Sequence, residues 1–184
     1  MEENVNYEEA RSGDIFKIGL TAGIIQGIIL IIFNIIAVMT GWAESNPISF
    51  FLVIVVSCIL LIIGIVYSHV KFKKQFTYMT YGQGLGLGVL VSLFGGLILS
   101  IFSFIYYNYV DNEFMARLSE NSILWMENQG ADSAQIEEQF KQNEESQSNP
   151  LGILSSTFIY VFVGFILTLI VAAITKKNEP IEDF

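Results

Sequence analysis

Hydrophobic residues in this chain fall into four long blocks separated by polar segments. The blocks cover residues 18–39, 48–67, 82–107 and 151–174, each at least 20 residues long, and contain no Asp, Glu, Lys, Arg or His. An α-helix of about 20 apolar residues crosses the hydrocarbon core of a bilayer. A water-soluble core would show shorter apolar runs interrupted by charges. The pattern predicts an all-α, polytopic membrane protein built as a bundle of four transmembrane helices.

The polar segments between the blocks differ in length. The first, around Gly41, Trp42 and Pro47, is short enough to predict an antiparallel helical hairpin. The second block is followed by a predicted loop at residues 69–80, in which His69 is expected to be a solvated residue at the membrane surface. The segment 111–149, between the third and fourth blocks, is long, polar and acidic.

That long segment is predicted to fold as a helical hairpin. Phe114, Leu118 and Trp125 recur at near-helical spacing before Gly130, a residue that commonly ends helices. A second short helix is predicted after it, and its signals are a capping box and two apolar residues one turn apart. These residues are Asp132 with Gln135, then Ile136 and Phe140.

The positions of the cations predict the orientation of the chain, because Lys and Arg beside transmembrane helices are held on the cytoplasmic side. Seven of the nine Lys and Arg residues lie on one side of a four-span topology: Arg11, Lys17, Lys71, Lys73, Lys74, Lys176 and Lys177. We therefore expect the tails 1–17 and 175–184 to be cytoplasmic and the segment 111–149 to lie outside.

Composition agrees with this prediction and removes several classes of function. Hydrophobic residues make up 53% of the chain and the mean hydropathy is +0.55. The formal net charge of −9, with only nine Lys and Arg, argues against a nucleic-acid partner, because phosphate binding needs clustered cations. Cys58 is the single cysteine, so no disulfide can form within the chain.

Small residues recur every four positions in three of the four blocks. On a helix this spacing forms a groove in which another backbone can approach closely, so we expect these residues to pack helices together. They are Gly19, Gly23 and Gly27 in the first block, Gly84, Gly88, Ser92, Gly96 and Ser100 in the third, and Gly152, Ser156 and Gly164 in the fourth, where Tyr160 interrupts the series. The same groove could pack helices within one chain or between chains, and the sequence leaves both open.

Residues for chemistry are scarce. The blocks contain no carboxylate or imidazole, so we expect no catalytic site, no cofactor site, no metal site and no enzymatic activity. Gln26 and Asn34 are the larger polar residues inside the blocks. Such amides commonly form hydrogen bonds between membrane helices, and the alternative is that they line a polar path.

Several segments together resemble a known family. They are Tyr81-Gly82-Gln83-Gly84, the stretch from Gly88 to Gly96, Tyr106-Tyr107 before Asp111, and then Gly130, Ile136 and Pro150. The chain is similar to the domain of unknown function 4199 family, small membrane proteins of Gram-negative bacteria. Asn112 departs from the pattern, since a proline commonly stands there. The resemblance implies the inner membrane, which would make the segment 111–149 periplasmic, and it implies no activity.

Three functional hypotheses follow. The leading one is a non-enzymatic scaffold or accessory subunit, whose periplasmic hairpin contacts another envelope protein or a second copy of the chain. The alternative is a small oligomeric permease or channel in which Gln26, Asn34 and the serines of the blocks line the path. The third is the binding of anionic lipids at Lys71, Lys73 and Lys74. Membrane lipids are expected partners in every case.

Overall fold

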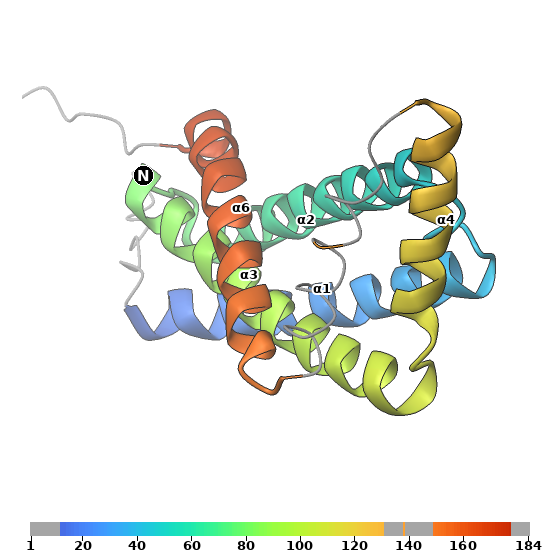
Figure 1. The fold of residues 1–184 in the computed structure, drawn as a ribbon. Helices are drawn as coiled ribbons and strands as arrows, with labels where there is room; N and C mark the ends of the chain where they lie inside the picture. The colour runs from blue at the N-terminus through green and yellow to red at the C-terminus, as the bar shows by residue number, and fades with distance from the viewer. Residues whose placement is uncertain (1–11, 131–137, 139–148, 178–184) are drawn as a thin grey trace, which may run out of the picture.

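The computed structural model describes residues 12–130, 138 and 149–177 of the chain. Four of its helices are long and apolar enough to cross a membrane, which confirms the predicted fold class. They are Ser12–Met39 (α1), Pro47–Phe76 (α2), Tyr81–Ile105 (α3) with its π-helical continuation Tyr106–Val110 (η1), and Gly152–Thr175 (α6). A shorter helix, Phe114–Asn128 (α4), crosses one end of the bundle (Figure 1). The predicted second helix of the hairpin falls outside the described residues, except for Glu138.

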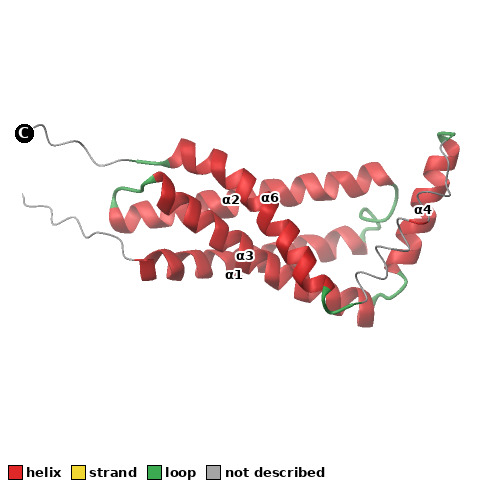
Figure 2. Ribbon diagram, turned by 60° about the vertical axis from the view of Figure 1, so that its left-hand side comes forward, coloured by secondary structure: helices red, strands yellow, loops and turns green. Residues whose placement is uncertain are grey.

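Helix α3 is the central element of the bundle. Helices α1 and α6 both pack along it, while α2 makes fewer contacts with its neighbours. Figure 2 shows α6 crossing α3 obliquely, and α2 and α6 moving apart toward α4. The buried apolar residues form three clusters, represented by Phe72 and Leu87 near the start of α3, by Leu61 and Val91 in the middle, and by Phe114 at the α4 end.

Polar side chains fix the beginnings of two transmembrane helices. Asn46 precedes Pro47 and accepts a hydrogen bond from the backbone N–H of Ser49, so α2 starts with a capped first turn. Thr80 and Gln83 form a reciprocal capping box at the start of α3. These caps place the turns between helices at fixed points in the sequence.

Helix α2 is longer than its apolar block. The sequence predicted a loop at residues 69–80, but the helix continues to Phe76, and only residues 77–80 connect it to α3. The helix ends where Thr77 adopts a positive φ of 62° and donates its N–H to the carbonyl of Lys73. Hydropathy falls at the edge of the bilayer, whereas the backbone stays helical beyond it because lysines extend from a helix into water without breaking it. Helix α1 likewise begins at Ser12, ahead of its block.

The connection between α2 and α3 is joined to the end of α6. Met79 and Lys177 exchange two backbone hydrogen bonds of 2.9 Å, forming an isolated antiparallel bridge. Five lysines, Lys71, Lys73, Lys74, Lys176 and Lys177, lie in the last turns of α2 or just after α6. We call this the lysine end of the bundle, as opposed to the α4 end.

Helix α4 is held against the α4 end by one arginine. Arg117 forms ion pairs with Glu44 in the turn between α1 and α2 (3.0 Å) and with Asp111 (2.7 Å). Arg117 donates hydrogen bonds to Asp111 and to Glu44, and these bonds, mainly those to Asp111, raise the pKa of Arg117 above its usual value. Asn121 adds a hydrogen bond of 2.8 Å to the backbone carbonyl of Glu44. The position of α4 over the bundle is therefore defined by polar contacts as well as by the burial of Phe114 and Leu118.

Candidate functional site

The small residues of α3 and α6 face one another in antiparallel register. A Cβ atom added to Gly84 would lie 3.2 Å from the Cβ of Ala172, and one added to Gly88 would meet Thr168. Further along the same two helices, Ser92 contacts Gly164. This pairing brings the two backbones close together over the lysine end and the middle of the bundle.

The glycines of α1 make a second close contact, with α3. A Cβ atom on Gly19 would come within 2.6 Å of the Leu90 side chain, and Gly23 and Gly27 meet Phe94 and Ile98 in the same way. The structure thus places these glycines between helices of one chain. These helix contacts do not include Ser100, Gly152 and Ser156 of the predicted series.

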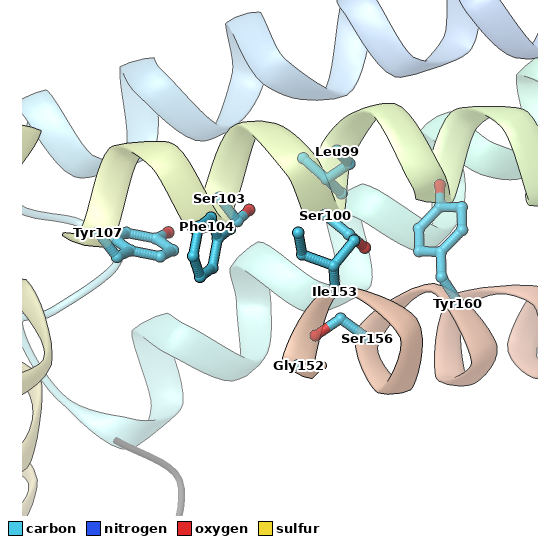
Figure 3. Close-up of a pocket in the computed structure, with 9 residues that line it drawn as sticks. All are labelled: Leu99, Ser100, Ser103, Phe104, Tyr107, Gly152, Ile153, Ser156 and Tyr160. Carbon is cyan, nitrogen blue, oxygen red and sulfur yellow. The ribbon is translucent and has the colours of Figure 1, made fainter. Parts of the chain in front are cut away.

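Those three residues line a cavity beside the close contact of Tyr160 with Gly96. The Tyr160 ring lies over Gly96, where an added Cβ would approach its Cδ1 to 2.6 Å. This cavity of about 170 Å³ holds three serines, and we call it the serine cavity. Its lining is Leu99, Ser100, Ser103, Phe104, Tyr107, Gly152, Ile153, Ser156 and Tyr160, and the side chains of α3 and α6 face one another across it (Figure 3).

A larger cavity of about 510 Å³ adjoins the serine cavity, in the space where α2 and α6 diverge. Its lining comes from all four long helices and from α4: Asn34, Ala43, Phe50, Val53, Ile54, Ser57, Cys58, Leu61, Leu99, Tyr107, Phe114, Met115, Leu118, Ser156, Ile159, Tyr160 and Val163. Toward the lysine end it stops at Leu61, whose side chain reaches Gly164 of α6. Toward the α4 end it is covered by Phe114 and Leu118.

The larger cavity reaches the apolar surface of the bundle. Ile54 of α2 and Ile159 of α6 both line it, yet they are 45% and 63% exposed. A cavity whose rim is made of exposed apolar side chains on membrane-spanning helices faces lipid rather than water. Its volume lies within the roughly 300–1,000 Å³ typical of small-molecule sites.

Polar groups in the larger cavity are mostly paired already. The Tyr107 hydroxyl donates to Oδ1 of Asn34 (3.1 Å), which links α3 to α1. The Ser57 hydroxyl donates to the carbonyl of Val53 (2.8 Å) within its own helix. This confirms for Asn34 the expectation of a hydrogen bond between helices.

Gln26 is placed differently from Asn34. It is 2% exposed, and its side-chain carbonyl oxygen packs against Gly64 of α2, where no Cβ could be accommodated. Its Nε2 lies near the Tyr160 hydroxyl, but within the described residues neither atom reaches a hydrogen-bond partner. Gln26 is not among the residues lining the larger cavity, so the structure does not bring Gln26 and Asn34 onto one polar path.

His69 is buried, and the prediction from the sequence that it is solvated was wrong. Its side chain is 0% exposed and lies where α2, α3 and α6 meet. Its Nε2 donates to the carbonyl of Gly84 (2.8 Å), and its Nδ1 pairs with the Thr175 hydroxyl (2.7 Å). The burial is possible because both ring nitrogens have partners. His69 is therefore a structural link at the lysine end.

The described lining of the two cavities consists of apolar side chains with a few hydroxyl and amide groups. None of the described residues that line the two cavities is charged. In the part of the chain that the structure describes, no three His, Cys, Asp or Glu side chains are grouped to hold a metal ion. Lys73, one of the three lysines considered for lipid binding, donates to the carbonyl of Thr175 at 3.0 Å and thus has a structural contact.

The sequence pattern indicated Gly152 and Ser156 only as packing residues and Ser100 also as a serine that could line a polar path, and the cavities were not predicted from it. The signal that could have found them is Tyr160. A bulky residue at a position of a small-residue series prevents close approach beyond it, and small residues further along then leave space.

The four apolar helices and the α4 crossing define the class of the protein: it is a multi-pass integral membrane protein. The family model described as "Protein of unknown function (DUF4199)" matches residues 21–177. The chain belongs to this family, as its sequence resemblance predicted. No curated protein and no solved structure matches it.

Proposed function

We propose that this chain is a non-enzymatic protein of the bacterial inner membrane that binds a mainly apolar, lipid-derived molecule in the larger cavity. The observation that carries the proposal is the exposed apolar rim of that cavity at Ile54 and Ile159. Together with the volume of about 510 Å³, it gives a lipid molecule lateral access from the bilayer without crossing a polar barrier.

Cys58 provides a direct test, because it lines the larger cavity and is the only cysteine in the chain. A membrane-soluble alkyl maleimide should label Cys58 in native membranes, and extraction of bound lipid with detergent should speed the labelling at least severalfold. A matched control is Ile63→Cys in a Cys58→Ser background, since Ile63 is on the same helix, 58% exposed and outside the cavity. Equal acceleration at both positions, or no lipid retained on the purified protein, would contradict the proposal.

The orientation is part of the proposal. The lysine end would face the cytoplasm and α4 the periplasm, because cations are retained on the cytoplasmic side. The cation at the α4 end that the structure describes, Arg117, is paired with two acidic residues, while the lysine end carries five lysines. A fluorescent protein fused after Phe184 should fluoresce, and a periplasmic-only reporter at the same position should stay inactive. The reverse result would overturn the orientation.

A scaffold or accessory role remains the second candidate, supported by the way α4 is held. Arg117 and Asn121 fix this helix to Glu44, while Leu124 on another side of α4 is 52% exposed. A rigidly held helix with an exposed apolar side chain could dock a membrane partner or a second copy. A photoreactive residue at Leu124 should then crosslink in native membranes more efficiently than one at Glu120, also exposed, on the same helix. Equal, background-level yields at both positions would remove this candidate.

A further inference from the structure

We infer that the bound molecule is an uncharged amphiphile, with its hydroxyl or carbonyl group in the serine cavity and its hydrocarbon chain in the larger cavity. This inference rests on the proposed lipid-binding function and adds the chemical class and the direction of the ligand. Candidates of this class are long-chain alcohols, diacylglycerols and prenyl compounds with a hydroxyl or carbonyl group.

The two cavities are adjacent parts of one space. They share four lining residues, Leu99 and Tyr107 from α3 and Ser156 and Tyr160 from α6. A molecule with two chemically different ends can therefore occupy both at once. The serine cavity, about 170 Å³, is the smaller of the two and suits a small polar group rather than a chain.

The hydrogen-bonding state of the hydroxyl groups indicates which end of the ligand lies in which cavity. Several Ser and Thr hydroxyls elsewhere in the bundle bond to carbonyls of their own helix, as Ser92, Thr157 and Thr168 do at 2.6 to 2.9 Å. Within the described chain, neither Ser100 nor Ser156 makes such a side-chain bond.

Ser103, the third serine of this cavity, also has no side-chain hydrogen bond to a described residue. Tyr160 also lines the cavity, but its buried hydroxyl lies near Nε2 of Gln26, outside the cavity lining. Of the three serines, Ser100 is 7% exposed, Ser103 is half-buried and Ser156 is exposed on the membrane-spanning part of α6. Unpaired hydroxyl groups in an apolar setting are costly, and a ligand hydroxyl or carbonyl would satisfy them. Two polar residues that line the larger cavity but not the serine cavity are already hydrogen-bonded, Asn34 to Tyr107 and Ser57 to a carbonyl of its own helix.

The described lining of the two cavities has no charged residue, and this indicates that the ligand is uncharged. None of the described residues around the two cavities is Asp, Glu, Lys, Arg or His. A carboxylate, phosphate or ammonium group placed there would have no counter-ion in a medium of low dielectric constant. A neutral hydroxyl or carbonyl group has no such penalty once it is hydrogen-bonded.

Three probes share the same photoreactive, clickable hexadecyl chain and differ only at its end. Hexadecanol has a neutral hydroxyl group, hexadecyl sulfate has a charged group, and hexadecane has no polar group. They would be added to the full-length protein in phosphatidylcholine vesicles, and crosslinked peptides would be mapped. We expect the alcohol to be captured about tenfold more than the sulfate. Its capture should fall about fivefold in Ser156→Ala, the effect of one lost hydrogen bond, while capture of the alkane stays unchanged.

Ser155→Ala is the matched control, because Ser155 is exposed like Ser156 but lines neither cavity, and its hydroxyl already bonds to the Gly152 carbonyl (3.0 Å). It should leave capture of the alcohol unchanged. Thermal unfolding of each variant shows that the fold is intact. If alcohol and sulfate are captured equally, or if Ser156→Ala and Ser155→Ala behave alike, the inference is wrong although a lipid still occupies the cavity. If no probe slows the alkyl-maleimide labelling of Cys58, the proposed function itself fails.

Discussion

The ring of Tyr160 in α6 lies against the backbone of Gly96 in α3, in the space that a Cβ atom at position 96 would occupy. The distance from that Cβ position to Cδ1 of Tyr160 is 2.6 Å, shorter than any ordinary carbon–carbon contact. Tyr160 lines both the serine cavity and the larger cavity, so the contact with Gly96 holds in place a wall that the two cavities share.

Gly96→Ala should displace the Tyr160 ring and destabilise the protein by roughly 1–3 kcal/mol, as expected when a methyl group is forced into a packed contact. Thermal unfolding in detergent measures the loss, and faster maleimide labelling of Cys58 reports the altered cavity. The matched control is Gly86→Ala on the same helix, where the nearest atom to the added Cβ, on Ile15, is 3.8 Å away. That variant should be neutral or slightly stabilised, since alanine favours helices more than glycine. A similar loss in both variants would contradict the role of the Tyr160 contact.

The register of α3 against α6 can be tested with an engineered disulfide. The Cβ position of residue 84 lies 3.2 Å from the Cβ of Ala172, slightly less than the roughly 3.5–4.5 Å that a disulfide needs. Gly84→Cys with Ala172→Cys, in a Cys58→Ser background, should therefore form a bond within one chain after mild oxidation. Non-reducing electrophoresis should show a monomer of altered mobility. A covalent dimer as the main product would mean that this series of small residues packs between chains.

The positions of the four membrane helices were predictable because a helix that crosses lipid needs about 20 uncharged, mostly apolar residues in a row, and such a stretch is visible in the sequence. An uncharged block of 20 residues has few other structures available to it. The four-residue spacing of Gly84 and Gly88 likewise indicated a packing groove, because helix geometry fixes which side chains share a face. These inferences use only local periodicity and length.

The cavities and the position of His69 were not predictable on the same basis. The larger cavity exists because α2 and α6 diverge beyond Leu61 and Gly164, and their crossing angle depends on three-dimensional packing that no local pattern records. His69 follows an apolar block and precedes lysines, so its polarity suggested solvent. Its burial depends on partners far along the chain, Gly84 and Thr175, that satisfy both ring nitrogens.

His69→Ala should weaken the lysine end of the bundle. The substitution leaves a space between α2, α3 and α6 and removes the hydrogen bonds to Gly84 and Thr175. We expect a loss of about 2 kcal/mol or more in unfolding free energy, combining the lost polar contacts with the cavity. A double-mutant cycle with Thr175→Val should show coupling, because both substitutions break the same contact. Thr21→Val is the control, since that exposed hydroxyl bonds only within α1. Strict additivity of His69→Ala and Thr175→Val would argue against the link.

Arg117→Gln should release α4 from the bundle without unfolding the membrane helices. Arg117 is partly exposed, so its two ion pairs contribute about 1 kcal/mol or less to global stability and are weakened by salt. Their removal should nevertheless increase hydrogen exchange in α4, because the described contacts that hold this helix in place include these pairs. The same increase should appear in the unsubstituted protein at high salt. Glu120→Gln, which alters an exposed charge on the same helix, should leave exchange unchanged. If α4 exchanges at the original rate in Arg117→Gln, then the apolar contacts of Phe114 and Leu118 and the Asn121 hydrogen bond hold it over the larger cavity without the ion pairs.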